Sequence, residues 1–125
     1  MKETTMTDKS KLIAQYNDEF RANMGHPNKE NSPVKGKYMM SRGIVNLDTI
    51  DQVDIMIKVR DFNDFNQDND PHGEHDMGRI HLESNKQDIL WKIDYYDVNY
   101  ENGSEDPSDL EKTRRVLTTM LSCEY

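Results

Sequence analysis

The segment from Asp64 to Asp76 holds the densest group of ionisable side chains in the chain, arranged around a Pro71–Gly73 turn. Two histidines in this segment, His72 and His75, lie three residues apart and have carboxylates on both sides. Imidazole and carboxylate groups together can bind a transition metal, and a histidine beside carboxylates can carry protons near neutral pH. The segment is therefore the first candidate for a functional site.

One hypothesis is that the segment binds a divalent transition metal and serves a metal-dependent hydrolase or nuclease. The ligands would be His72, His75 and Asp76, and His81 on the next strand would supply a further imidazole. No established zinc-binding spacing is present, however, and the match to a calcium loop is poor because Arg79 stands where a bidentate glutamate is required.

The same cluster also fits a structural role. Aspartate and asparagine side chains commonly accept hydrogen bonds from the backbone of their own loop, so acidic clusters are ordinary turn-forming devices. In that case His75 and Asp76 would tie the loop to the following hairpin, and Tyr95 or Tyr96 would donate to its carboxylates. The alternatives differ in geometry, because a metal site needs ligands that converge from the loop and the strand together.

Composition limits the possible partners. The chain has 125 residues, enough for one domain, with 34% hydrophobic residues, 32% charged residues and a formal net charge of −8. Because nucleic-acid phosphates repel so acidic a surface, direct DNA or RNA binding is disfavoured and a basic protein partner is favoured. The single Cys123 permits no intrachain disulfide, and no apolar run is long enough for a membrane span or a signal peptide, so a cytoplasmic protein is expected.

The favoured hypothesis is a non-enzymatic protein, without a cofactor, that presents its carboxylates to the cationic groove of a protein that itself binds nucleic acid. One part of this surface would come from the Asp64–Asp76 segment and the other from the acidic loop after the second strand of the hairpin. The residues expected to contact the partner are Asp64, Asp68, Asp70, Glu74, Asp76, Asp97, Glu101, Glu105 and Asp106.

Hydrophobic periodicity predicts the elements that must position these residues. Apolar residues at helical spacing indicate helices at residues 10–24 and 48–64, and the second should be the most buried because apolar residues cover much of its circumference. Alternating apolar and polar residues indicate an antiparallel hairpin at residues 77–83 and 89–96, and a short strand is expected at 38–45. Four polar residues of the first helix fall outside its apolar stripe: Lys11, Asn17, Asp18 and Arg21.

A third helix is expected to begin at Ser108, because Pro107 precedes it and Glu111 completes a capping box three residues later. The residues expected to face the sheet from this helix are Leu110, Val116, Leu117, Met120 and Leu121.

This element order predicts an α+β fold, in which three helices cover one face of a small antiparallel sheet made of the hairpin and the short strand. Residues 9–125 would form a single domain after a frayed N-terminus at residues 1–8. The side chains expected on the uncovered face of the sheet are Arg79, His81, Asp94 and Tyr96.

Four stretches of the chain resemble the signature of a family of short bacterial, plasmid and phage proteins that is defined only as a domain of unknown function. The stretches lie within about residues 44–125 and read F-N-D-F-N-Q-D-N-D-P-H-G-E-H-D-M-G, W-K-I-D-Y-Y-D, G-S-E-D-P and T-R-R-V-L-T-T-M-L-S-C-E-Y. The one departure is Met77, where the family is expected to have phenylalanine.

The resemblance implies that the acidic loop, the hairpin and the last predicted helix belong to one unit, and it supplies no reaction. It also implies a setting on mobile genetic elements, where small acidic proteins often act as counter-defence inhibitors. Such inhibitors bind nucleases or CRISPR effectors at their basic nucleic-acid channels, which agrees with the favoured hypothesis.

Overall fold

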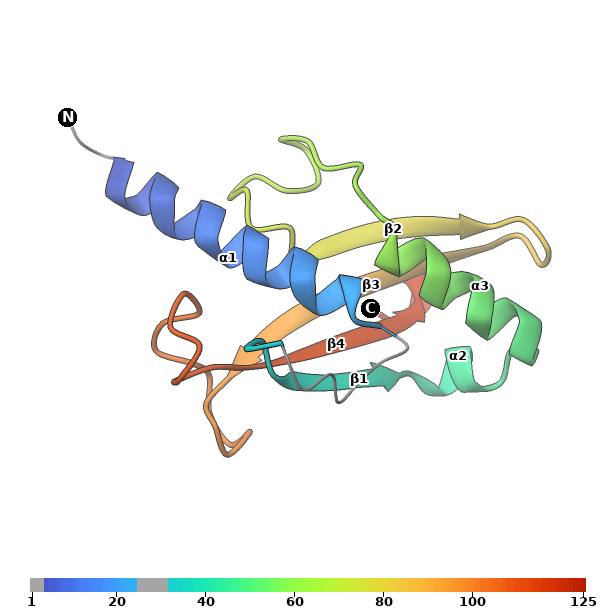
Figure 1. Cartoon of the computed structure of the whole chain (residues 1–125). Helices are drawn as coiled ribbons and strands as arrows, with labels where there is room; N and C mark the ends of the chain where they lie inside the picture. The colour runs from blue at the N-terminus through green and yellow to red at the C-terminus, as the bar shows by residue number, and fades with distance from the viewer. Residues whose placement is uncertain (1–3, 25–31) are drawn as a thin grey trace.

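The computed structural model of the protein describes residues 4–24 and 32–125. Within these residues, three helices, four strands and a terminal turn of 3₁₀ helix follow one another along the chain (Figure 1). In chain order they are α1 (Thr4–Ala22), β1 (Gly36–Met40), α2 (Arg42–Val45), α3 (Thr49–Arg60), β2 (Met77–Leu82), β3 (Gln87–Tyr96), β4 (Arg114–Leu121) and η1 (Ser122–Glu124).

The strands form one mixed sheet in the order β1-β4-β3-β2. Strand β3 pairs antiparallel with both β2 and β4, whereas β1 pairs parallel with β4. Helices α1 and α3 lie across the same face of the sheet, and the short α2 follows the end of β1 (Figure 1). The predicted α+β class is confirmed, but the sheet has four strands and is not purely antiparallel.

The hydrophobic core lies between the sheet and the two long helices. Phe20 of α1 and Ile55 and Val59 of α3 belong to one buried cluster with Trp91 and Leu117 of the two central strands. Complete burial of an apolar side chain of this size stabilises the folded state by about 1.5–3 kcal/mol. Both long helices lie on this one side of the sheet, and within the described residues neither of them covers the opposite side (Figure 1).

The predicted hairpin is confirmed as β2 and β3. Its register places Gly78 opposite Trp91, and a Cβ atom at Gly78 would overlap both the Trp91 indole and the Phe62 ring. Glycine at this position therefore allows the tryptophan to pack flat against β2. On the other face the strands carry the side chains expected there: Arg79, His81, Asp94 and Tyr96.

The predicted third helix is wrong, because Arg114–Leu121 forms β4 in the middle of the sheet. Side chains alternate along it, so that Arg115 and Leu117 are buried under the helices while Val116 and Thr118 are partly buried on the other face. The run is rich in β-branched residues, and pairing with two neighbouring strands satisfies its backbone on both edges. These contacts outweigh the helical spacing of its apolar residues.

The capping box that suggested this helix closes turns instead. The Ser108 hydroxyl donates to the Asp106 carboxylate at 2.6 Å, and the backbone N–H of Glu111 donates to the Asp109 carboxylate at 3.0 Å. Short oxygen-bearing side chains can satisfy a turn as well as a helix N-terminus, because both leave backbone N–H groups unpaired. The turns lead the chain directly into β4.

Strand β1 also differs from its prediction, since it ends at Met40 and not at residue 45. Ser41 follows it, and its hydroxyl oxygen accepts from the backbone N–H of Ile44 and so caps the single turn of α2. The Glu124 carboxylate stabilises the junction between β1 and α2, because it accepts from the Ser41 hydroxyl at 2.6 Å and from the Gly43 N–H at 3.0 Å. The apolar residues beyond Met40 therefore belong to a helix and not to the strand.

Helix α3 was expected to be the most buried helix, and this prediction is wrong. Its residues Ile50, Val53 and Ile57 are 82%, 48% and 43% exposed, because only the side of α3 that carries Ile55 and Val59 packs into the core. At the other end of the chain, α1 already begins at Thr4, before its predicted start. Residues 1–3 of the predicted frayed terminus, and residues 25–31 of the loop after α1, lie outside the described residues.

Candidate functional site

A network of buried and half-buried polar side chains fixes the acidic segment that the sequence singled out. The network, called the polar clasp below, joins α1 to residues 70–75 and to strands β3 and β4. Its members are Asn17, Asp18, Arg21, Asp70, Glu74, His75, Tyr95 and Arg115.

Asn17 is the central member of the polar clasp, and it is completely buried. Its amide nitrogen donates to the Glu74 carbonyl oxygen and to the Tyr95 hydroxyl, both at 2.9 Å. Its amide oxygen accepts from the Arg115 Nε at 2.5 Å, and the Tyr95 hydroxyl donates in turn to the Glu74 carboxylate at 3.1 Å. One amide on α1 therefore connects the acidic segment to both central strands of the sheet.

Arg115 brings a completely buried guanidinium into this network. Besides the bond to Asn17, its Nη2 donates to the Pro107 carbonyl oxygen at 2.9 Å, and its guanidinium lies over the rings of Tyr16 and Tyr95. Burial lowers the pKa of Arg115, while nearby groups including the Glu74 carboxylate raise it. The same desolvation raises the pKa of Tyr95, so that its hydroxyl stays neutral and remains a hydrogen-bond donor.

Arg21 is the second buried arginine of the polar clasp, and it connects α1 to the end of α3. Its Nη1 donates to the carbonyl oxygens of Val59, in the last turn of α3, and of Phe62, just after the helix, each at 2.8 Å. Its Nη2 donates to the Asp18 carboxylate at 2.8 Å, and its guanidinium lies 5.0 Å from the centre of the Trp91 ring. Burial lowers the pKa of Arg21, and the hydrogen bond and charge of Asp18 oppose that decrease.

His75 is held on three sides. Its Nδ1 lies 2.9 Å from the Asp18 carboxylate, and its ring stacks on Phe65 with 4.0 Å between the ring centres. Its backbone has a positive φ of 58°, and its backbone N–H donates to the Asp70 carboxylate. Asp70, with only 5% of its side chain exposed, also accepts from the backbone N–H of Glu74. The imidazole and the aspartate therefore stabilise the turn between them.

The sequence suggested that His75 and Asp76 bind the acidic segment to the hairpin, and that Tyr95 or Tyr96 donates to a carboxylate. These contacts form in part. The backbone N–H of Ile93 donates to the Asp76 carbonyl oxygen at 2.8 Å, and Tyr95 donates to Glu74 as expected. The His75 side chain, by contrast, binds α1 and not the hairpin. Burial raises the pKa of the Asp76 carboxyl, and the nearby Glu74 charge raises it further.

The structure does not bring the candidate metal ligands together. His72 is exposed, His75 lies against Asp18, and the His81 Nδ1 lies 2.8 Å from the Asp88 carboxylate on the neighbouring strand. Among residues 4–24 and 32–125, no three histidine, cysteine, aspartate or glutamate side chains form a group that could hold a metal ion. The set His72, His75, Asp76 and His81 is therefore not assembled as a metal centre.

The nine carboxylates predicted to bind a partner fall into two groups. Three face inward or are half-buried near the polar clasp: Asp70, Glu74 and Asp76. The other six are at the surface to different degrees, with four exposed and Asp97 and Asp106 half-exposed. These six form what is called the acidic end below: Asp64, Asp68, Asp97, Glu101, Glu105 and Asp106.

The acidic end has a defined place in the fold. Its residues come from the loop before β2 and from the loop between β3 and β4, which both lie at the end of the sheet where β2 and β4 begin (Figure 1). Backbone N–H groups, above all that of Glu101, lower the pKa of Asp97, and the Ser108 hydroxyl lowers the pKa of Asp106. Both carboxylates therefore remain ionised in weakly acidic solution.

Four members of the polar clasp were not recognised as site residues in the sequence: Asn17, Asp18, Arg21 and Arg115. Asn17 and Arg21 lie beside the apolar stripe of α1, where a polar residue normally indicates the solvent face. Arg115 lies in the stretch that was predicted to be helical. An available signal was the β-branched residues of this run, Val116, Thr118 and Thr119, because a strand would place Arg115 on the same face as Leu117.

Residues 40–124 match the model of a protein family described as "Protein of unknown function (DUF3768)". The chain belongs to this family. The matched region begins at the end of β1 and includes α3, the acidic segment, the hairpin and β4, whereas α1 precedes it. The chain matches no curated protein and no solved structure.

Within the family the acidic segment is thus one part of a continuous unit that extends through β4. The α1 residues that complete the polar clasp, Asn17, Asp18 and Arg21, lie outside the matched region. In the described ranges, no helix combines the length and the apolar character needed to cross a bilayer.

Proposed function

We propose that the protein is a non-enzymatic binding protein that docks its acidic end on the cationic nucleic-acid-binding surface of a partner protein. In this role it is a counter-defence inhibitor of a nuclease or CRISPR effector. The observation that carries the proposal is the exposure of Asp64, Asp68, Glu101 and Glu105 on two loops at the same end of the sheet. No ion pair among the described residues neutralises any of these four carboxylates.

Electrostatics supports this choice of partner. A net charge of −8 repels nucleic acid but attracts a protein surface that is built to hold phosphates. Complementary charge mainly accelerates association and gives the complex a strong dependence on salt. The polar clasp contributes by holding the loop before β2 in one conformation, which reduces the entropy lost on docking.

The geometry also changes the list of residues that contact the partner. Asp70, Glu74 and Asp76 act within the protein, because hydrogen bonds or burial already engage them. Their contribution to docking is to position the loop that carries Asp64 and Asp68.

The test is a pull-down from a host lysate with the immobilised protein, at low and at high salt. The proposal expects recovery of a basic nucleic-acid-binding protein at low salt, with much weaker recovery at high salt. Recovery should also fall when the four exposed carboxylates are neutralised together, by Asp64→Asn, Asp68→Asn, Glu101→Gln and Glu105→Gln.

A matched control removes the same amount of charge from the other end of the sheet and from α3. The control substitutions are Asp48→Asn, Asp51→Asn, Glu83→Gln and Asp88→Asn. Equal loss of the partner in both variants would show that only net charge matters and would contradict a docking surface at the acidic end. The absence of any basic partner at low salt would refute the proposal itself.

A further inference from the structure

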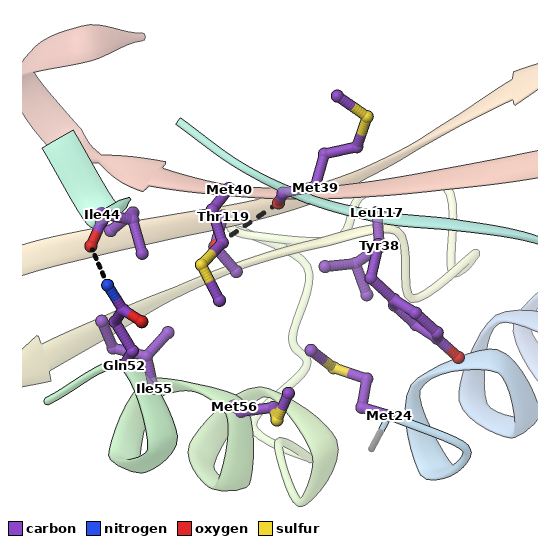
Figure 2. A pocket seen from close by; sticks show the side chains of 10 residues that line it. All are labelled: Met24, Tyr38, Met39, Met40, Ile44, Gln52, Ile55, Met56, Leu117 and Thr119. Carbon is purple, nitrogen blue, oxygen red and sulfur yellow. Dashed lines mark hydrogen bonds between the residues drawn. The ribbon is translucent and has the colours of Figure 1, made fainter. Parts of the chain in front are cut away.

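An apolar groove lies between the edge strand β1 and helix α3. Its cavity has a volume of about 50 Å³. Figure 2 shows the side chains of Met24, Met40 and Met56 pointing into the space between the strand and the helices, above Ile55. Met40 at the mouth is 41% exposed, so the groove is open to solvent.

Strand β1 is at the edge of the sheet, and its residues Tyr38, Met39 and Met40 line this groove. The bonds from Arg115 N–H to the Lys35 carbonyl and from Ser41 N–H to the Thr119 carbonyl show that odd-numbered residues of β1 pair with β4. The ladder therefore directs the N–H and C=O groups of Tyr38 and Met40 away from β4. Within the described part of the chain, no strand pairs with that second edge.

The other face of the same strand is basic, although the protein as a whole is acidic. Lys35 and Lys37 are exposed there, and neither has a salt bridge among the described residues. The Lys37 ammonium lies 4.1 Å from the centre of the Tyr100 ring, which keeps it beside the strand. Side chains directly across a sheet interact, so these lysines favour acidic residues on any strand added next to them.

The same lysines disfavour a second copy of this chain as the occupant. Two β1 strands paired edge to edge would bring their lysines onto one face of the joined sheet, where like charges repel. A small apolar molecule would fill the cavity but would leave the backbone groups of Tyr38 and Met40 without a protein partner. An extended peptide can satisfy both features at once.

We infer that the groove between β1 and α3 binds an extended segment of a partner protein, which adds to the sheet as a strand beside β1. One aliphatic side chain of that segment enters the methionine-lined cavity, and acidic side chains on its opposite face meet Lys35 and Lys37. The segment thus alternates apolar and acidic residues. Methionine side chains adapt to different apolar shapes, so the groove accepts leucine, isoleucine or valine at the cavity. This site is separate from the acidic end and does not depend on the proposed function.

The first test uses a capped, fluorescently labelled peptide of alternating leucine and glutamate. We expect saturable binding by fluorescence anisotropy. In hydrogen exchange followed by NMR, the amides of Tyr38 and Met40 should exchange quickly in the free protein and slowly with the peptide, whereas those of Lys37 and Met39 should be protected in both. Saturable binding without new protection at Tyr38 and Met40 would overturn the inference, as would an absence of binding.

Peptide chemistry separates strand addition from simple apolar contact. N-methylation of alternate amides removes every donor on one edge of the peptide, and methylation of the other alternate set is its matched control. Only the set that faces β1 should abolish binding. Equal affinity of both methylated peptides would contradict strand addition.

Charge reversal at Lys35→Glu with Lys37→Glu should weaken the peptide by about tenfold, because two attractive cross-strand pairs become repulsive. The control is the same reversal at the exposed Lys11 and Lys112, which lie outside the groove and should leave affinity unchanged. Equal effects in both variants would overturn the assignment of the acidic face. A dimer of the free protein with Tyr38 and Met40 already protected would show that a second copy occupies the edge.

Discussion

The acidic segment before β2 and the groove between β1 and α3 are opposites in composition and in how they use their side chains. In the segment, the buried or half-buried groups Asp70, Glu74 and His75 already have partners inside the protein. In the groove, Met40 and the edge of β1 face solvent, and no strand in the described ranges pairs with that edge. The acidic segment therefore uses part of its ionisable groups to stabilise the fold, whereas the groove between β1 and α3 can still bind a partner.

The comparison shows that a dense cluster of ionisable side chains in a sequence is not necessarily exposed for binding. A buried charge is tolerated only when hydrogen bonds and opposite charges surround it, so a fold that buries two arginines must supply carboxylates, carbonyls and aromatic rings close to them. The acidic segment supplies part of that set. Other carboxylates of the same segment, such as Asp64 and Asp68, are exposed and can meet an external partner.

The largest predicted effect is at the centre of the polar clasp. Arg115→Ala should reduce the free energy of unfolding by about 3–5 kcal/mol, because Asn17 and the Pro107 carbonyl lose a buried charged donor. The neighbouring Arg114→Ala, on the other face of the sheet, is the control and should cost about 1 kcal/mol or less. Urea denaturation measures both, and similar losses would mean that the polar clasp is not a major source of stability.

A smaller effect should separate two aspartates of the acidic segment that lie two positions apart. Asp70→Ala should cost about 1–3 kcal/mol, because the backbone N–H groups of Glu74 and His75 lose their acceptor. Asp68→Ala should change stability by about 0.5 kcal/mol or less, since its side chain is exposed. If urea denaturation gave equal losses in the free energy of unfolding for both variants, the division into inward and outward carboxylates would be wrong.

The groove should tolerate change at its mouth better than at its wall. Met40→Ala should cost about 1 kcal/mol or less, since Met40 is 41% exposed. Ile55→Ala should cost about 2–5 kcal/mol, because Ile55 is 2% exposed and its loss leaves a cavity. Thermal and urea denaturation measure both variants. A large loss from Met40→Ala would show that the mouth belongs to the core and is not an open binding surface.

The pH dependence of stability should reveal the buried position of Asp76. Its pKa is raised above the ordinary value of 3.8, so the folded protein binds more protons than the unfolded chain between those two pKa values. The unfolding free energy of the wild type should therefore fall, relative to that of Asp76→Asn, as the pH rises through this window. Urea denaturation at a series of pH values checks the trend, with Asp68→Asn as the control for the loss of one negative charge. A constant difference between Asp76→Asn and the wild type would contradict the assignment.

The smallest predicted effect is that of metal removal. Treatment with a chelator should leave the melting temperature unchanged, because the candidate ligands His72, His75 and His81 do not converge. A ligand that binds the native state raises its stability, so a fall in melting temperature on chelation would revive the metal hypothesis. Elemental analysis of protein made without a histidine tag provides an independent check.

Two elements show where sequence patterns were sufficient and where they were not. The hairpin was predicted because alternation in residues 77–82 and 87–96 records one buried and one open face, a purely local property. Strand β4 was missed because its apolar residues also fit a helical spacing. Pairing with β1, more than seventy residues earlier in the chain, settles that ambiguity, and it cannot be read from a local window.

The candidate site follows the same division. The nine carboxylates and the histidines were visible as residue types, and so was the tendency of Tyr95 to donate to a carboxylate. Whether these side chains point inward or outward could not be predicted, because Asn17 and Asp18 contact the acidic segment from α1, 57 residues away in the sequence. The groove was not visible at all, since its methionines are scattered over β1, α3 and the turn that follows α1.

By itself, the sequence determined the α+β class, the hairpin, the acidic surface charge and the family. These depend on composition, on local periodicity or on whole motifs, which survive without knowledge of distant contacts. Only the tertiary structure decided which carboxylates are inward, that Arg114–Leu121 is a central strand, and that among the described residues β1 pairs on one edge only and lines an apolar cavity. Each of these depends on which distant segments lie side by side, and burial and hydrogen bonding are set by those neighbours.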